Sequence, residues 1–200
     1  MNLSAGPSFR EMGVFFQLLS YLRAERSPGE HEHPLILVDM PATGHTLSLT
    51  GLPDLLLRLM PRGPIATALR AGQSYLNDPE QAAAWVVTLP ETLPVSEALE
   101  LLEGLETTAM PIGGVIVNRI PVDPFTAGER AALKPFLADH DVLGGEGFRR
   151  PELATRETAR LRAGTRWPIY ALPELAHEGL VVAMADEIER TRRLRPSMRP

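Results

Sequence analysis

The stretch from residue 35 to residue 46, LILVDMPATGHT, holds the side chains of this chain that are best suited to chemistry. Its aliphatic run ends abruptly at Asp39, and a carboxylate at the end of a buried strand could hold a metal-bound water in a nucleotide site. Gly44, next to Thr43, can bring a backbone N–H close to a terminal phosphate. One carboxylate at a strand end is not specific, because Asp39 could equally cap the following helix.

The residue types argue against several other chemistries. There are no cysteines, which rules out a disulfide scaffold, a thiolate zinc site, a redox CxxC pair and a cysteine nucleophile. His31 and His33 lie in a polar stretch, and this context favours a solvated loop over a metal site. The sequence has no G-x-S-x-G elbow, so a serine hydrolase is not supported.

Composition limits the class of protein and its partners. The 200 residues, 44% of them hydrophobic, suffice for a sizeable core, and we expect a single domain over residues 1–195 with a disordered tail at 196–200. The net charge of −5 argues against a nucleic-acid partner. No aliphatic run is long enough for a transmembrane segment and no secretory signal is evident, so we expect a cytoplasmic protein.

Short aliphatic runs alternate with amphipathic stretches along the chain. The runs predict strands at residues 35–38, 85–89, 115–117 and 167–171. The amphipathic stretches predict helices at residues 8–26, 47–60, 65–77, 94–105, 126–140, 152–162 and 180–193. Strands alternating with helices indicate an α/β fold, with a mainly parallel, doubly wound sheet flanked by helices on both faces.

Polar side chains follow the predicted strands where each one ends. Asp39, Glu91, Asn118 and the Pro173–Glu174 pair occupy these positions. In parallel sheets, ligands bind beyond the carboxyl ends of the strands, which makes this edge the candidate site. Taken singly, Asn118 also suits an ordinary turn after a strand.

The segment at residues 35–53, LILVDMPATGHTLSLTGLP, resembles the Walker B and switch II region of the ArsA-type anion-transporting ATPases. That family includes the arsenite-pump ATPase and the ATPase that targets tail-anchored membrane proteins. Its usual pattern is a strand followed by D-T-A-P-T-G-H-T. The residues that match in place are Asp39, Thr43, Gly44, His45 and Thr46. The middle of the loop departs from the pattern, since it reads MPA, with Pro41 at its centre.

Three further segments resemble the same family in the same order. Residues 85–97, WVVTLPETLPVSE, are similar to a strand, a Pro-Glu pair and a helix of the family. Residues 114–119, GVIVNR, resemble the strand whose terminal Asn reads adenine, and residues 168–179, PIYALPELAHEG, resemble the loop that closes over the base. Four ordered segments are more specific than any one alone, and they imply a P-loop NTPase-like fold.

The resemblance implies a role for each matched residue. Asp39 would hold the water bound to Mg²⁺, and Gly44 would sense the γ-phosphate of ATP. Asn118 would hydrogen-bond the adenine through its amide, which has both a donor and an acceptor. The other residues implied at the nucleotide are Thr43, Arg119, Leu172 and Pro173, and those implied to switch are Pro41, His45, Thr46 and Glu91.

The phosphate-binding loop of the family is missing from these residues. There is no G-x-x-x-x-G-K-[ST] sequence, and the single lysine, Lys134, lies in the unrelated context LKP. Without that loop, phosphate affinity and hydrolysis should both collapse. The resemblance also implies that the P-loop strand belongs to this sheet, so its absence leaves strand edges unpaired.

Three functions remain open at this point. The first is an ATP hydrolase part that supplies switch II and the adenine pocket, while upstream sequence or a partner chain supplies the P-loop. Its expected cofactors are ATP and Mg²⁺, and its expected partners are a second copy or a P-loop-bearing relative in a dimer, together with a client protein. The second is a non-catalytic pseudo-ATPase that binds such a relative or client. The third is a MinD-like positioning ATPase, which fits the GHT of switch II less well.

The helix predicted at residues 152–162 is rich in arginine. With its flanks it contains Arg149, Arg150, Arg156, Arg160, Arg162 and Arg166, alternating with Glu152 and Glu157. This pattern favours a solvated helix face, and a contact to anionic lipid or a partner subunit is the alternative.

Overall fold

The computed structural model describes residues 13, 17–22, 24–27, 30–31, 33, 35–40, 57–58, 61–139, 144–174, 181–182, 184–186 and 189. The chain divides into two compact units, and each is described by itself. The first comprises Met1–Ala84 and Glu103–Pro111, and the second comprises Trp85–Leu102 and Ile112–Pro200.

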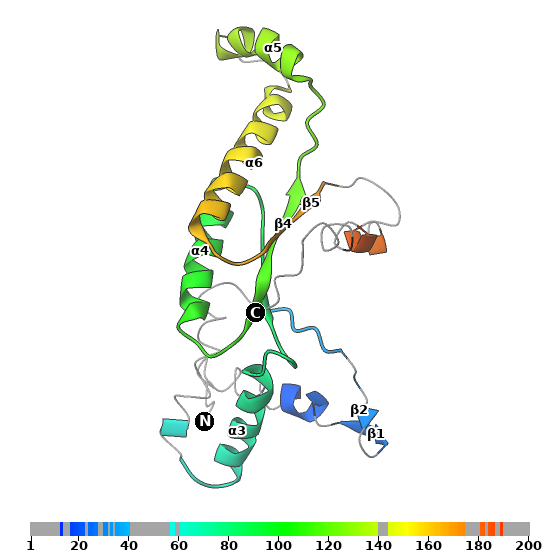
Figure 1. The fold of residues 1–200 in the computed structure, drawn as a ribbon, viewed down its shortest axis with the longest axis vertical. Helices are drawn as coiled ribbons and strands as arrows, with labels where there is room; N and C mark the ends of the chain where they lie inside the picture. The colour runs from blue at the N-terminus through cyan, green and yellow to red at the C-terminus, as the bar shows by residue number, and fades with distance from the viewer. Residues whose placement is uncertain are drawn as a thin grey trace, which may run out of the picture. The chain divides into compact units, whose positions relative to one another are not determined.

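A three-stranded parallel sheet forms the centre of the second unit (Figure 1). Its strands are β3 (Ala84–Thr88), β4 (Ile112–Ile120) and β5 (Ile169–Pro173), in the order β3-β4-β5. The sequence prediction of these three strands and of an α/β fold is therefore confirmed, although β4 is longer than expected. Among the described residues β5 is an edge strand of this sheet, and Pro168 next to it cannot donate a ladder hydrogen bond.

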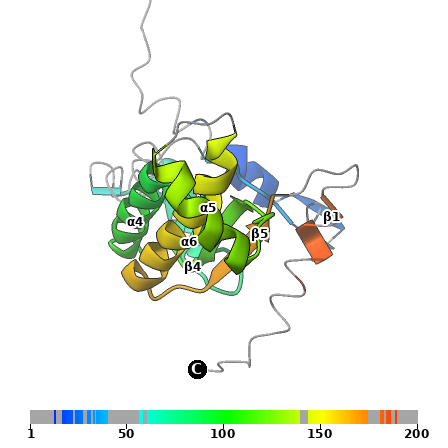
Figure 2. The same cartoon turned by 90° about the horizontal axis from the view of Figure 1, so that it is seen from above.

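Two of the three helices between these strands lie along one face of the sheet. α4 (Thr92–Glu106) connects β3 to β4, and α5 (Ala127–Asp139) and α6 (Gly145–Gly164) connect β4 to β5. Both views show α4 and α6 side by side (Figures 1 and 2). Each connection is a crossover between parallel strands, and since both advance across the sheet in the same direction, right-handed crossovers place their helices on the same face.

Close packing joins α6 to α4 and the sheet. A Cβ built on Gly164 would lie 2.8 Å from a methyl carbon of Leu99, so a larger residue there would require the Leu99 side chain to move. The buried hydrophobic side chains of the unit come from the strands and both helices. They are Val86, Val95, Ala98, Leu102, Ile112, Val115, Val117, Phe148, Ala154, Leu161, Ile169 and Leu172.

An aromatic ring explains two glycines at the start of β4. Trp85 of β3 lies 5.5 Å from the ring of Tyr170, and a Cβ on Gly113 would come within 2.6 Å of its indole. Gly114 has a φ of +153°, and its Cβ would lie 2.8 Å from the carbonyl oxygen of Pro168. Both positions therefore require glycine, since any larger residue would collide with the neighbouring strands.

Beyond β4, an arginine holds the loop that leads to α5 and the beginning of α6. Arg130 pairs with Asp123, and its Nη1 donates to the carbonyl oxygen of Phe148 at 3.0 Å. Its guanidinium also lies 4.4 Å from the centre of the Phe148 ring. The hydrogen bond from Arg130 lowers the pKa of the Asp123 carboxyl and outweighs the opposing effect of burial.

A capping box begins α5. The backbone N–H of Thr126 donates to the Glu129 carboxylate at 2.7 Å, and the backbone N–H of Glu129 donates to the Thr126 hydroxyl at 3.3 Å. These bonds to Thr126 hold the pKa of Glu129 below its usual value. The helix predicted at residues 126–140 is therefore confirmed, with Pro135 inside it.

The beginning of α6 differs from the prediction. Residues 144–147 read as a glycine loop, but the helix starts at Gly145, seven residues before the predicted start at residue 152. Gly144 adopts the left-handed conformation, φ 87°, which allows the chain to turn into the helix. Burial of Phe148 then stabilises a turn that helix propensity alone disfavours.

The first unit contains α3 (Pro64–Leu76), which confirms the helix predicted at residues 65–77. Leu69 of α3 packs against Leu19, and Leu22, Leu57, Ala68 and Leu76 surround this pair. The helix predicted at residues 8–26 is too long, because the chain is helical only up to Leu22 among the described residues. It then enters β1 (Glu25–Ser27), which pairs antiparallel with β2 (Glu30–His31).

The strand predicted at residues 35–38 is wrong. These residues have no regular secondary structure, and the side chains of Leu35 and Leu37 are 74% and 86% exposed. A buried parallel strand needs a ladder partner and cover on both faces. Neither sheet among the described residues includes this segment, so its backbone has no ladder to join.

The described part of the C-terminal segment agrees with the last predicted helix, since residues 181–182, 184–186 and 189 are helical. None of the helices within the described residues combines the length and the hydropathy needed to cross a bilayer.

Candidate functional site

The carboxyl end of β4 contains a break in its pairing with β5. The two strands run in step up to Val117, but from there to the next pair β4 advances three residues while β5 advances two. The extra residue makes a β-bulge that contains Asn118 and Arg119. Arg119 has a φ of 55°, the left-handed conformation that non-glycine residues rarely adopt. The bulge therefore turns the end of this strand out of the regular pleat.

The side chain of Asn118 is anchored by the residue that follows it. Its Oδ1 accepts a hydrogen bond of 2.9 Å from the backbone N–H of Arg119. Among the described residues, none accepts a hydrogen bond from its Nδ2, which therefore retains two donors. Oδ1 also retains a second lone pair. Asn118 is half-buried, so it offers a donor and an acceptor from a fixed position at the edge of the sheet.

The end of β5 lies beside this bulge. The backbone N–H of Glu174 donates to the carbonyl oxygen of Ile120 at 2.8 Å, which extends the pairing past the bulge. Leu172 is only 2% exposed, whereas Pro173 is half-buried. Of the two residues predicted to pack on the adenine base, Pro173 is therefore the one whose surface a ligand could contact. Both lie in β5, although the sequence predicted a loop for them.

The end of β3 passes directly into the first turn of α4. The backbone N–H of Glu91 donates to the carbonyl oxygen of Leu89 at 2.9 Å, and the N–H of Val95 donates to the carbonyl oxygen of Glu91 at 3.0 Å. The side chain of Glu91 is exposed. Because β3 and β4 are parallel neighbours, Glu91, which follows β3, and Asn118, near the end of β4, lie at the same edge of the sheet.

A buried carboxylate ties α6 to this first turn of α4. Glu157 is 3% exposed, and its Oε1 accepts hydrogen bonds from Arg156 at 3.0 Å and from the hydroxyl of Thr92 at 3.3 Å. Its Oε2 accepts from Arg160 at 2.6 Å. Arg160 in turn donates to the Ser96 hydroxyl, so the cluster contacts two residues of α4 that lie one turn apart.

The charges in this cluster decide the ionisation of Glu157. Burial by itself raises the pKa of the Glu157 carboxyl. The hydrogen bond from Arg156 and the positive charge of Arg160 outweigh burial, and they hold that pKa below its usual value. Glu157 is therefore ionised at neutral pH. Its carboxylate holds the start of α4 through the hydrogen bond from Thr92.

Sequence reasoning missed Glu157, although the pattern contains a signal for it. Glu157 falls at helical spacing with Ala154, Thr158 and Leu161, and all four are buried. The arginines that dominate the helix predicted at residues 152–162 favour a solvated face. The structure supports this in part, since Arg149 and Arg162 are exposed. The buried position of Glu157 is the exception.

The other predicted site residues are placed as follows. Asp39 belongs to the first unit, where it is exposed and outside regular secondary structure. Pro41, Thr43, Gly44, His45 and Thr46 lie outside the described residues. The structure thus brings together Asn118, Arg119 and Pro173 at adjacent strand ends, with Glu91 on the same edge.

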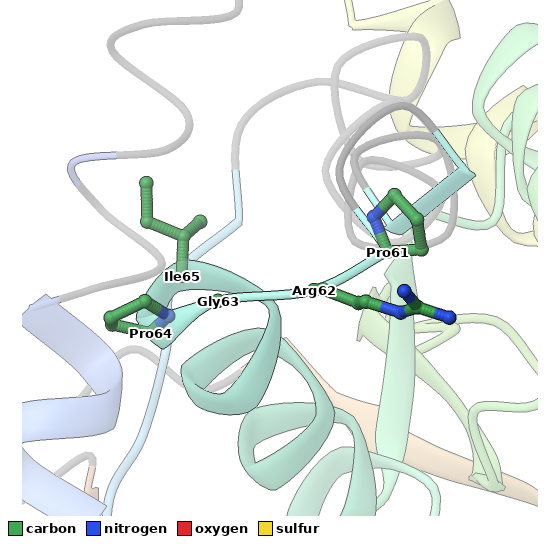
Figure 3. Close-up of a pocket in the computed structure, with 5 residues that line it drawn as sticks. All are labelled: Pro61, Arg62, Gly63, Pro64 and Ile65. Atoms are coloured by element: carbon green, nitrogen blue, oxygen red, sulfur yellow. The ribbon is translucent and has the colours of Figure 1, made fainter.

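Two other features of the described residues lack the groups that a binding or catalytic site needs. A hollow of about 450 Å³ lies at the start of α3, but five successive residues line it, Pro61 to Ile65, and Arg62 is its one charged side chain (Figure 3). The side chains diverge instead of converging on a ligand. Within the described residues, no group of three or more histidines and acids could hold a metal ion.

Comparison with known proteins adds evidence of relationship. No protein-family model matches the chain. The ATPase BagA of Mycobacterium tuberculosis is 40% identical over 84 residues, which cover 42% of this chain and 24% of BagA. The arsenical pump-driving ATPase of Escherichia coli is 32% identical over 176 residues, which cover 85% of this chain and 28% of that protein.

A third relative gives the same result. The arsenical pump-driving ATPase of Acidiphilium multivorum is 32% identical over 117 residues, which cover 56% of this chain and 18% of that protein. This chain therefore spans between 18% and 28% of the lengths of these three relatives.

Proposed function

This chain is related to the ArsA-type ATPases, and from that relationship we propose that it forms one part of an ATP-hydrolysing protein. In this proposal it supplies switch II and the adenine pocket, and upstream sequence or a partner chain supplies the P-loop. The observation that carries the proposal is the bulge at Asn118 and Arg119, at the carboxyl end of a parallel strand.

The geometry of Asn118 suits a purine base with an amino group. A carboxamide that offers one donor and one acceptor pairs with adenine, which presents an amino donor beside a ring-nitrogen acceptor. The bond from Arg119 N–H to Oδ1 fixes the rotamer of Asn118 before any ligand arrives. Pro173 supplies an apolar surface next to it.

Hydrolysis would depend on Asp39 and on the residues that follow it. The side chain of Asp39 is exposed, and a carboxylate can accept the hydrogen bonds that would hold a water in place. Mg²⁺, when bound with ATP, would neutralise charge on the phosphates. The backbone N–H of Gly44 would detect the terminal phosphate and change the path of Pro41, His45 and Thr46.

The base-recognition part of the proposal is tested by nucleotide binding. The test uses this chain together with the upstream sequence or partner chain that supplies the P-loop. In that assembly, Asn118→Ala should weaken ATP binding about tenfold to a hundredfold, because one bidentate base contact is lost. Binding of tripolyphosphate, which has no base, should not change. Asn77→Ala, in the first unit, is the matched control. Equal weakening of ATP and tripolyphosphate would contradict adenine recognition by Asn118.

The catalytic part is tested by turnover in the same assembly. Asp39→Asn should abolish most ATP hydrolysis while leaving ATP binding measurable, because it removes the negative charge that would hold the Mg²⁺-bound water. The exposed Asp186→Asn is the control. Unchanged turnover in Asp39→Asn would contradict a catalytic role for Asp39. A stable, ATP-bound assembly without turnover in the unsubstituted protein would favour the pseudo-ATPase.

A further inference from the structure

The ends of β4 and β5 pair again beyond the bulge. The register continues at Ile120 and Pro173, but Pro173 has no N–H to donate. The next residue provides the donor, since the N–H of Glu174 bonds to the carbonyl oxygen of Ile120 at 2.8 Å. The two groups proposed to contact the base, the Asn118 amide and the surface of Pro173, lie on the two strands that this bond joins. Their separation therefore depends on how Glu174 is held.

An arginine of α6 holds the side chain of Glu174. The Nη2 of Arg150 donates to both carboxylate oxygens of Glu174, at 3.4 Å to Oε1 and 3.3 Å to Oε2. The two side chains are about half-buried, at 49% and 41% exposed. The backbone beside Arg150 is anchored, because the side chains of Phe148 and Pro151 are buried. α6 is thus a fixed element from which a charged side chain reaches the end of β5.

The adjacent arginine makes a different contact. Arg149 pairs with Glu146 of its own helix at 3.8 Å, and these two side chains are 58% and 80% exposed. A pair at this spacing joins two turns of one helix. Arg150 instead reaches a residue 24 positions further along the chain, directly after β5. Arg149 is therefore a matched control for Arg150, with the same charge at the neighbouring position.

We propose that Arg150 is a positioning residue for base recognition. Its guanidinium holds the Glu174 carboxylate, and Glu174 in turn keeps Pro173 at a set distance from the Asn118 amide. Arg150 acts through Glu174 and does not touch the base. This inference rests on the proposed function and adds a residue of α6 that determines how tightly the base is held. Because the pair is partly exposed, its effect on base binding is about threefold to fivefold.

Charge reversal and charge exchange test the pair in the assembly that contains the P-loop. Arg150→Glu should weaken ATP binding about threefold to fivefold and leave tripolyphosphate binding unchanged, because tripolyphosphate has no base to contact the end of β5. Glu174→Arg alone should do the same. The double variant restores opposite charges, so its ATP affinity should return to within about twofold of the unsubstituted value. Losses that add without recovery, or an equal loss for tripolyphosphate, would overturn the proposal.

The neighbouring substitution controls for the change in net charge. Arg149→Glu alters the charge of α6 by the same amount and leaves Glu174 paired, so ATP affinity should stay within about twofold of the unsubstituted value. Equal weakening by Arg149→Glu and Arg150→Glu would assign the effect to the overall charge of α6. That result would overturn the specific role of Arg150.

Amide exchange of the 200-residue chain follows the contact without nucleotide. Arg150→Gln removes the charge and keeps the helix, and it should speed exchange of the Glu174 N–H about threefold to fivefold. The N–H of Val115 bonds to the carbonyl oxygen of Pro168 at 2.8 Å near the start of β5, and its exchange should not change. Unchanged exchange at Glu174, or equal acceleration at Val115, would contradict the hold of Arg150 on the end of β5.

Nucleotide binding separates a failure at Arg150 from a failure of the proposed function. If Asn118→Ala weakens ATP binding and Arg150→Glu does not, base recognition stands and the role of Arg150 is overturned. If the unsubstituted assembly binds ATP no more tightly than tripolyphosphate, base recognition itself is contradicted, and the positioning role fails with it. Amide exchange at Glu174 then still reports whether α6 holds the end of β5.

Discussion

β4 and residues 35–38 contain similar aliphatic sequences but adopt different structures. β4 contains the run VIV, and the side chains of Val115 and Val117 are fully buried. Residues 35–38 read LILV, yet Leu37 is 86% exposed and the segment has no regular structure. β4 has a strand on each side, whereas residues 35–38 join neither sheet of the described residues.

The physical reason lies in the backbone. An aliphatic run favours an extended chain because its branched side chains suit a pleated surface. The run becomes a strand only where neighbouring strands satisfy its N–H and C=O groups and other elements cover its side chains. An aliphatic run therefore indicates that a segment can join a sheet. The neighbouring strands and the elements that cover its side chains decide whether it does.

The largest expected contrast comes from truncating one leucine in each setting. Leu161 of α6 is fully buried, so Leu161→Ala should lower the free energy of unfolding of the second unit by about 3 kcal/mol. Leu37→Ala should change stability by less than about 0.5 kcal/mol, because the side chain is already in water. Denaturant titrations check both. The two tryptophans, Trp85 and Trp167, report on the second unit, and circular dichroism reports on the whole chain.

A cost above about 1 kcal/mol for Leu37→Ala would contradict the exposed state of residues 35–38 and show that this segment is buried in solution.

The next effect concerns a glycine that the pairing of β4 requires. Gly114→Ala should destabilise the second unit by about 2 kcal/mol, because the new methyl group would meet the carbonyl oxygen of Pro168 at 2.8 Å. Gly128→Ala in α5 has open space and should stabilise by about 0.5 kcal/mol. Urea titration followed by tryptophan fluorescence measures both. The same sign for the two substitutions would show that the close approach of β4 and β5 is absent.

Acid should weaken the contact between α4 and α6. The folded-state pKa of Glu157 is lowered, so its contribution to stability is complete above the ordinary pKa of glutamate and is lost as the pH falls through the lowered value. Glu157→Gln should therefore reduce stability at neutral pH and flatten the pH dependence in the acid range. The exposed Glu97→Gln should leave the profile unchanged. Urea midpoints measured from neutral to acid pH check this, and an unaltered slope in Glu157→Gln would argue against the buried ion pair.

The smallest effect is expected at the bulge itself. Arg119 has a φ of 55°, which glycine adopts without strain, so Arg119→Gly should keep or raise the stability by up to about 1 kcal/mol. The same type of change in the regular part of the strand, Ile116→Gly, should destabilise the second unit. Thermal unfolding separates the two. A loss above about 1 kcal/mol in Arg119→Gly would indicate that the arginine side chain holds the bulge in place.

Part of the fold and of the site could be predicted from local patterns. The strands at β3, β4 and β5 and the helices α3, α4 and α5 follow from apolar spacing, because each element depends mainly on its own residues. Placing Glu91 after β3 follows from the same pattern, whereas Asn118, predicted to follow its strand, lies within the longer β4. The early start of α6 could not be predicted, since it depends on burial of Phe148 against distant residues.

The sequence by itself determined the α/β order of elements, the net negative charge, the missing cysteines and the ArsA-type motifs, because all of these depend on residue type and near neighbours. Tertiary structure alone decided that residues 35–38 stay outside the sheet, that Glu157 is buried between two arginines, and that a bulge at Arg119 fixes the amide of Asn118. Each depends on elements distant in the chain: on the strands that residues 35–38 fail to pair with, on the packing of α6 against α4, and on the pairing of β4 with β5. A local pattern does not record such contacts.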